Sequence, residues 1–254
     1  SRVDGGDGTE EENERKASDL IYDVFPEHIA HALRDGKKVE PEKKEMVSIY
    51  FSDIVGFTDI CSKIDVEKVS DMLDRLYTAL DRIAGELDIF KIETIGDAYM
   101  CVTNLVEEQE DHAARLAFFA MKAVQVAAET MVDEEQKELG CVKLRIGINS
   151  GPVVANVIGT SRPKYTLFGD TVNIASRMES NSLPQKILCS EKTAHLIQEQ
   201  KQSFEQRVCV LERGIIRVKG KGPMETYWIC SEEEMLASKV VVQEEDKSIA
   251  DFVI

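Results

Sequence analysis

Between residues 45 and 149, two kinds of apolar periodicity follow one another along the chain. Alternation of apolar and polar residues is typical of strands, and a spacing of about three to four is typical of helices. The segments read as strand 45–53, helix 66–87, hairpin 90–100, helix 110–131 and strand 142–149. This order predicts an α+β fold with a ferredoxin-like βαββαβ core, followed by extra strands and a short helix.

Each of these segments has one apolar face that we expect to be buried. In the first strand, Val47, Ile49 and Phe51 alternate with Ser48 and other more polar neighbours. The remaining buried positions are expected to be Phe90, Ile92 and Ile95 in the hairpin, and in the two helices Val66, Val69, Leu73, Leu76, Leu80, Ile83, Leu87, Ala113, Leu116, Ala120, Val124 and Ala127.

The formal net charge of −16 over 254 residues restricts the possible ligands. A field of this sign repels phosphates, so we expect no nucleic-acid partner and no general binding to anionic membranes. A phosphate-bearing substrate must therefore be held by local cations and metals. The apolar runs are shorter than a membrane span.

Metal binding by histidine or cysteine is not expected. The six cysteines lie mostly in apolar, strand-like runs without CxxC spacing, which indicates reduced thiols in a cytosolic compartment. His28 and His31 are three apart on a predicted helix, but no third ligand lies nearby in the sequence. We expect them to be surface or packing residues.

The N-terminal part of the chain is predicted to lead into the folded region. The chain begins with Ser1, which indicates a fragment of a longer protein whose sensor or membrane portion lies elsewhere. Residues 1–16 are polar and acidic and are predicted to be disordered. Residues 18–36 are amphipathic at helical spacing, with a break at Pro26 and a stop at Gly36.

Two aspartates are the first candidates for a functional site. Asp53 ends the first strand and Asp97 lies in the hairpin turn, and in a ferredoxin-like sheet their strands pair at the centre. Two hard oxygen ligands at one edge would suit Mg²⁺, or two Mg²⁺ that bridge substrate phosphates. Taken singly, each aspartate is better explained as a strand-end cap or a turn former.

The run IVGFT after Asp53 favours the functional interpretation. Gly56 allows the backbone to approach a ligand closely. The amides of Gly56, Phe57 and Thr58 would stand at a strand-to-helix turn, where they can bind a triphosphate.

A third candidate is the stretch FGDTVNIASRMES at 168–180. If Asp170 or Thr171 caps a helix, Asn173 and Arg177 fall four apart on one face, so that an amide and a cation point the same way. An exposed helix with a salt bridge is the alternative. The segment VKGKG at 218–222 reads as a flexible hairpin and is a weak signal by itself.

Together these segments resemble the catalytic domain of class III nucleotidyl cyclases. FSDIVGFT, KIETIGDAYM, RIGINSGPVVANVIG, FGDTVNIASRMES and VKGKG occur in the order and spacing of that family, over roughly residues 45–230. The preceding DLIYDVFPEHIAHALRDGKKVEPE resembles the linker of receptor-type guanylyl cyclases, and among eukaryotic cyclases the chain is most similar to these.

The resemblance implies a head-to-tail homodimer with active sites at the interface. Asp53, the backbone of Ile54 and Asp97 of one chain would hold two Mg²⁺ or Mn²⁺ ions per site. The other chain would supply Asn173 to orient the ribose, Arg177 to stabilise charge on the transferred phosphorus, and Lys219 to hold the terminal phosphates.

The resemblance also assigns two positions that read the base. Glu93 corresponds to the residue that selects the purine, and its carboxylate can accept from guanine N1–H and the 2-amino group together but repels adenine N1. Thr166 departs from the pattern, because guanylyl cyclases usually have cysteine there and adenylyl cyclases aspartate. Its hydroxyl can donate to guanine O6 or accept from the adenine amine, or simply fit a strand surface.

The sequence therefore predicts a guanylyl cyclase that converts GTP to 3′,5′-cyclic GMP and pyrophosphate. An adenylyl or dual-specificity cyclase is the first alternative, and a non-catalytic regulatory subunit is the second. The predicted divisions are a disordered lead-in (1–16), a helical connector (17–44), the catalytic domain (45–230) and a C-terminal tail (231–254). We expect a cytoplasmic domain of a larger, membrane-attached or sensor-linked protein.

Overall fold

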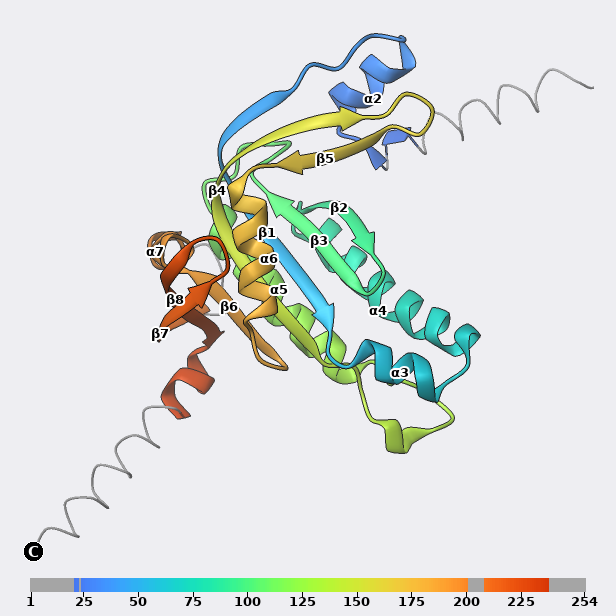
Figure 1. The fold of residues 1–254 in the computed structure, drawn as a ribbon, viewed down its shortest axis with the longest axis vertical. Helices are drawn as coiled ribbons and strands as arrows, with labels where there is room; N and C mark the ends of the chain where they lie inside the picture. Colours follow the sequence, from blue (N-terminus) through green and yellow to red (C-terminus); the bar gives the residue numbers. More distant parts are fainter. Residues whose placement is uncertain (1–20, 23, 201–207, 238–254) are drawn as a thin grey trace, which may run out of the picture. The chain divides into compact units, whose positions relative to one another are not determined.

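The computed structural model describes residues 21–22, 24–200 and 208–237. The predicted disorder of residues 1–16 and most of the C-terminal tail lie outside the described residues. The chain divides into two compact units, one made of residues 1–43 and 154–167 and the other of residues 44–153 and 168–254. Figure 1 shows the helices and strands of both units.

The second unit contains the predicted ferredoxin-like core. The strands of the sheet lie in the order β2-β3-β1-β4-β6-β8-β7, and β5 pairs with β4 outside this path. The elements in chain order are β1 (Glu42–Ile54), α3 (Phe57–Lys63), α4 (Val66–Glu86), β2 (Phe90–Ile95), β3 (Ala98–Thr103), α5 (His112–Glu129), the 3-10 helix η1 (Lys137–Leu139), β4 (Leu144–Ile158), β5 (Lys164–Phe168), α6 (Asp170–Ser180), β6 (Lys186–Ser190), α7 (Glu191–Gln200), β7 (Val208–Val218) and β8 (Gly222–Ser231).

The first four strands confirm the predicted topology. β3 pairs with β1 and with β2, both antiparallel, so the hairpin strand β3 lies next to the first strand as expected. The strands and helices that follow β4 extend the sheet on its other side, where β6 runs parallel to β4. We predicted one short helix after the core, and the described residues contain two, α6 and α7.

In the described part of the chain, hydrophobic cores lie on both faces of the sheet. The larger core contains α4 and α5, and the smaller one contains Met178 of α6. In β6, Ile187 and Cys189 belong to the larger core, whereas Leu188 between them belongs to the smaller one. This alternation places α6 on the face of the sheet opposite α4 and α5, and Figure 1 shows α6 running along β4.

Several predicted burial positions were wrong. Ile95 is 63% exposed because it ends the edge strand β2, and Val66 is 82% exposed because it is the first residue of α4. In β1, Ser48 and Tyr50 are buried as well as Val47 and Ile49, so both faces of this central strand are covered.

The first unit contains the predicted connector helix. α2 (Glu27–Arg34) begins after Pro26 and ends before Gly36, close to the bounds expected from these two residues. The ring Nε2 of His28 lies 2.6 Å from a carboxylate oxygen of Glu42. None of the helices in the described part of the chain is both long and apolar enough to cross a bilayer.

Candidate active site

The second unit brings Asp53 and Asp97 together at one edge of the sheet, which we call the acidic rim. Asp53 is the next-to-last residue of β1, and Asp97 lies in the turn between β2 and β3. Because β1 and β3 are antiparallel with Ser52 opposite Tyr99, the end of β1 meets the start of β3. Residues 44 positions apart in the sequence therefore share one site, as the topology predicted.

The two carboxyl groups of the acidic rim are close enough to influence one another. The backbone N–H of Ile54 donates a hydrogen bond to Asp97 Oδ2 at 3.3 Å. Burial, followed by the neighbouring Asp53 carboxyl group, raises the pKa of Asp97 to about 6. Two converging carboxylates that repel each other form a donor set that fits a hard divalent cation.

Arg145 of β4 is a residue of this site that the sequence analysis missed. Its Nη2 lies 2.8 Å from Asp53 Oδ2, and its Nε lies 3.2 Å from Glu179 Oε1 at the end of α6. Burial raises the pKa of Glu179, although Arg145 opposes this shift. The available signal was an arginine between Leu144 and Ile146 in a strand pattern, which marks a charge pointing away from the core.

The second part of the candidate site is the exposed face of α6, which we call the α6 face. It consists of Asn173 and Arg177, which lie one helical turn apart and are both exposed. Within the described residues, neither side chain has a hydrogen-bond or ion-pair partner. The predicted salt bridge of the alternative interpretation is therefore absent from the described part of the chain.

The start of α6 differs from the prediction. Gly169, with φ of +137°, is the N-cap residue, while Asp170 and Thr171 already lie within the helix. Gly169 supplies no side chain for capping, and Asp170 forms an ion pair with Lys221. Thr171 Oγ1 donates to the carbonyl of Pro152 at 2.7 Å instead of capping the helix.

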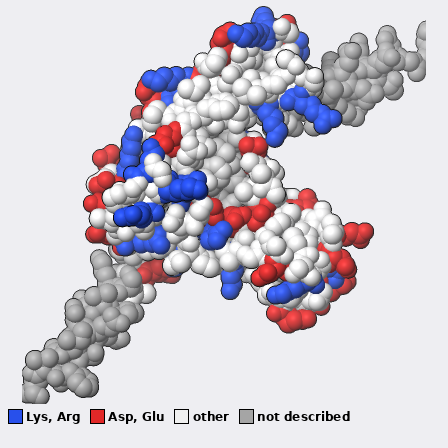
Figure 2. Space-filling model, in the orientation of Figure 1, with Lys and Arg blue, Asp and Glu red and all other residues white. Residues whose placement is uncertain are grey.

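The two lysines of VKGKG lie in the turn between β7 and β8, as expected for a hairpin. Lys221 is held by Asp170, whereas the described residues include no ion-pair partner for Lys219, which is exposed. Basic side chains gather over β7, β8 and α6, and acidic side chains gather near the end of β1 and the β2–β3 turn (Figure 2).

The residues predicted to hold phosphates surround the start of α3. Gly56 has φ of +74°, a left-handed conformation that favours glycine, and Phe57 begins the helix. The structure therefore gives Gly56 a conformational role in the turn after the acidic rim. Phosphate binding by Gly56, Phe57 and Thr58 stays a prediction.

The two predicted base-reading positions fall in different units. Glu93 is a half-buried residue of β2, next to a shift in the register between β2 and β3. Thr166 is a half-buried residue of β5 in the first unit. Their joint reading of a base stays a prediction.

The six cysteines all lie in the described residues, and none of them forms a disulfide bond. Among the described residues there is no group of three or more His, Cys, Asp or Glu side chains arranged to hold a metal. The acidic rim therefore offers two carboxylates, and a metal bound there would require further oxygen ligands from backbone, water or substrate.

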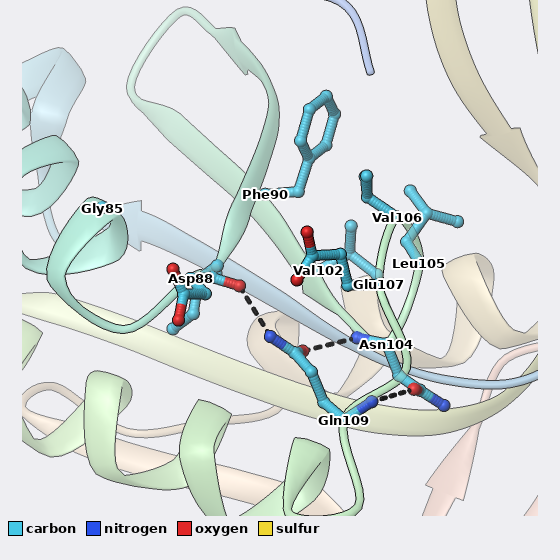
Figure 3. A pocket seen from close by; sticks show the side chains of 10 residues that line it. Gly85, Asp88, Phe90, Val102, Asn104, Leu105, Val106, Glu107 and Gln109 are labelled. Atoms are coloured by element: carbon cyan, nitrogen blue, oxygen red, sulfur yellow. Dashed lines mark hydrogen bonds between the residues drawn. The ribbon is translucent and has the colours of Figure 1, made fainter. Parts of the chain in front are cut away.

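Two cavities of the second unit lie outside the acidic rim. One, of about 300 Å³, lies where β2 begins and β3 ends, at the opposite end of this hairpin from Asp97 (Figure 3). Gln109 bonds both Asn104 and the carbonyl of Asp88 there. The other, of about 500 Å³, is lined by the first turn of α6 together with Asn149, Ser150 and Ser190. None of the predicted site residues lines the first cavity.

A ferredoxin-like sheet with an acidic rim and an α6 face is the arrangement expected of a nucleotidyl cyclase. The family model "Adenylate and Guanylate cyclase catalytic domain" matches residues 39–231, and the chain belongs to this family. This confirms the family that the sequence motifs predicted.

Individual relatives agree with this assignment. Guanylate cyclase soluble subunit beta-2 of Rattus norvegicus is 42% identical over 215 residues, which are 85% of this chain and 30% of that protein. Retinal guanylyl cyclase 1 of Rattus norvegicus is 41% identical over 220 residues, 86% of this chain and 19% of that protein. The chain thus spans less than a third of the length of these two relatives.

Among solved structures, the chain is similar to the guanylate cyclase domain of RhGC from Catenaria anguillulae, which was solved in complex with GTP. The TM-score is 0.67 at 38% identity, and the match covers 75% of this chain and 98% of that one. The fold is therefore that of a cyclase catalytic domain.

Proposed function

We propose that the chain is a guanylyl cyclase that converts GTP to 3′,5′-cyclic GMP and pyrophosphate. The observation that carries this proposal is the pairing of Asp53 with Asp97 at the acidic rim, in a chain that belongs to the nucleotidyl cyclase family. The reaction is an in-line attack of the ribose 3′-hydroxyl on the α-phosphorus.

The acidic rim would hold two Mg²⁺ or Mn²⁺ ions per active site. The ligands from this chain would be Asp53, Asp97 and the carbonyl of Ile54. Divalent ions bound there would lower the pKa of the 3′-hydroxyl and neutralise the departing pyrophosphate. The mutual repulsion of the two carboxyl groups supports this assignment, because a cation between them would relieve it. Arg145 would have to share Asp53 with the metal.

The α6 face would act on the same substrate from the other side. Arg177 would stabilise the negative charge that develops on the transferred phosphoryl group, and Asn173 would orient the ribose. Lys219 would hold the terminal phosphates, together with the amides of Gly56, Phe57 and Thr58.

We propose that two copies of the chain assemble head to tail, so that the α6 face of one copy completes the acidic rim of the other. Asn173 and Arg177 are exposed and without partners in the described residues, which suits groups that act on a ligand held by a second copy. The opposite charges of the two regions support this arrangement (Figure 2).

The choice of GTP rests on Glu93. A carboxylate suits guanine, which offers two donors on the same edge, and it opposes adenine, which offers an acceptor. Thr166 discriminates poorly, so an adenylyl or dual-specificity cyclase is the second candidate. Assays of GTP and ATP with the same metal ion decide between them.

The decisive test is to purify the chain, determine its oligomeric state by gel filtration, and assay it with GTP. We expect a dimer that forms cyclic GMP with Mg²⁺ or Mn²⁺. A chain that is inactive alone but active with a different cyclase chain would instead be a regulatory subunit. Because the relatives named above are longer than this chain, we also propose that the domain works on the cytoplasmic side of a larger, sensor-linked protein.

A further inference from the structure

One face of β4 consists of residues that contact α6. Arg145, Gly147, Asn149 and Gly151 alternate along the strand, while Leu144, Ile146 and Ile148 face the larger core. A Cβ atom on Gly147 would lie 1.9 Å from the backbone N of Glu179. The backbone of α6 therefore packs directly on the strand, because glycine leaves room for it.

Hydrogen bonds to β4, and not a capping side chain, hold the first turn of α6 in place. Asn149 Nδ2 donates to the carbonyl of Thr171 at 3.0 Å, and Thr171 Oγ1 donates to the carbonyl of Pro152 at 2.7 Å. A Cβ atom on Gly151 would lie 2.6 Å from Thr171 Oγ1. An uncapped helix of 11 residues is marginal by itself, so these contacts determine where it lies.

Asn149 is held in turn by a buried polar network. Ser190 Oγ at the end of β6 donates to Asn149 Oδ1 at 2.7 Å. Ser190 Oγ also lies 3.1 Å from Thr193 Oγ1 in the first turn of α7, and Thr193 donates to Ser150 Oγ at 3.0 Å. Asn149 is 4% exposed and Thr193 fully buried, so water competes little for these bonds.

The network continues to the other face of the sheet. Ser150 Oγ lies 2.7 Å from Ser48 Oγ of β1, which lies 2.8 Å from the Nδ1 of His112 at the start of α5. Burial lowers the pKa of His112, so its ring is neutral at physiological pH. The chain of contacts thus joins α5 and β1 to the first turn of α6.

We propose that Asn149 is a positioning residue, which fixes α6 so that Asn173 and Arg177 face the substrate, and that Thr193 supports it through Ser190. This inference rests on the proposed cyclase function. Asn149 contacts no substrate group; its effect passes through the backbone of α6. Loss of Asn149 should therefore lower kcat more than it raises KM.

The main variants are Asn149→Ala and Thr193→Val, with Thr226→Val as a matched control. Thr226 is also a fully buried threonine with one hydroxyl hydrogen bond, to the carbonyl of Gly214 at 2.9 Å, but it is outside the network. We expect kcat for GTP to fall about tenfold or more in Asn149→Ala and about threefold or more in Thr193→Val, with KM changed less than about threefold. Thr193→Ser keeps the hydroxyl and should keep kcat.

Thr226→Val should keep kcat within about twofold even if its melting temperature falls. Equal losses of kcat in Thr226→Val and Thr193→Val would overturn the proposal, since any buried hydroxyl would then matter equally. Wild-type kcat in Asn149→Ala would overturn it directly.

Subunit mixing shows whether Asn149→Ala impairs the α6 face or the acidic rim. In the proposed dimer, a chain with Asn149→Ala should regain activity when mixed with an Asp53→Asn chain, but not when mixed with an Arg177→Ala chain. The opposite pattern would overturn the proposal, because the lesion would then act at the acidic rim.

Hydrogen exchange separates this proposal from the proposed function. Amides of residues 170–180 should exchange faster in Asn149→Ala than in wild type or Thr226→Val, whether or not the chain is a cyclase. Unchanged exchange in α6 would refute the positioning role. Faster exchange in Asn149→Ala, combined with a wild-type protein that forms no cyclic nucleotide, would instead refute the proposed function alone.

Discussion

The acidic rim and the α6 face differ in how completely one chain satisfies them. At the acidic rim, Asp53 and Asp97 are partly buried and contact each other. Arg145 forms an ion pair with Asp53, and the amide of Ile54 donates a hydrogen bond to Asp97. On the α6 face, Asn173 and Arg177 are exposed and have no partners among the described residues. The sheet therefore satisfies the first region within one chain, while the second region lies on its surface, where we propose that a ligand or a second chain completes it.

The difference follows from how each half is supported. The acidic rim depends on strand pairing, because the register between β1 and β3 determines where the two aspartates lie. The α6 face depends on the seating of one uncapped helix against glycines of β4. Lesions should therefore act locally at the rim and through helix placement at α6.

The largest expected effect is at the acidic rim. Asp53→Asn or Asp97→Asn should reduce cyclic GMP formation about a thousandfold or more, because each removes a charged metal ligand without changing side-chain volume. Gel filtration and circular dichroism should show an intact fold and dimer. Added Mn²⁺ should raise the melting temperature of wild type but not of either variant. Turnover like that of wild type in either variant would refute the metal assignment.

Subunit mixing tests whether the two halves come from different chains. Asp53→Asn and Arg177→Ala chains should each be nearly inactive. Mixed in equal amounts with free exchange, half of the dimers are heterodimers with one intact site, so activity should reach about a quarter of wild type. The control is a mixture of Asp53→Asn with Asp97→Asn, which leaves no intact site. No recovery despite proven exchange would show that each chain builds its own site.

Sequence patterns predicted the acidic rim better than the α6 face. Asp53 and Asp97 were predictable because a ferredoxin-like topology brings β1 and β3 together by rule. Arg145 was missed, because its partners Asp53 and Glu179 are distant in the sequence. The neighbouring positions of β1 and β4 bring Asp53 to it, and packing of α6 on Gly147 brings Glu179. The N-cap was wrong because Gly169 takes a positive φ that the motif did not reveal.

The ends of helices and strands were also predicted less well than their middles. Ile95 and Val66 fitted apolar patterns but lie at the ends of their elements, where neighbours no longer cover them. Periodicity reports the average face of a segment and not the position at which burial stops.

Base selection is the next effect in size. Glu93→Lys turns an acceptor into a donor that suits adenine N1, and Thr166→Asp adds an acceptor for the adenine amine. Each polar contact in a desolvated pocket is worth about 1–3 kcal/mol, so the double variant should change the GTP:ATP ratio of kcat/KM about a hundredfold towards ATP. Thr166→Asp alone should be a poor enzyme with a mismatched pocket, and Thr166→Cys should sharpen the preference for GTP only slightly. An unchanged ratio in the double variant would show that these two side chains do not read the base.

The smallest effect separates the two lysines of the β7–β8 turn, which belong to the same basic region as the α6 face. Lys219 has no ion-pair partner in the described residues and is proposed to hold the terminal phosphates, so Lys219→Ala should raise KM for GTP about tenfold with a smaller change in kcat.

Lys221 instead forms an exposed ion pair with Asp170, a contact of little energetic weight. Lys221→Ala is therefore the matched control, two residues away in the same hairpin and with the same loss of charge, and it should leave KM within about twofold. Equal increases in KM for both variants would mean that the turn acts through its net charge, and the specific role of Lys219 would then be wrong.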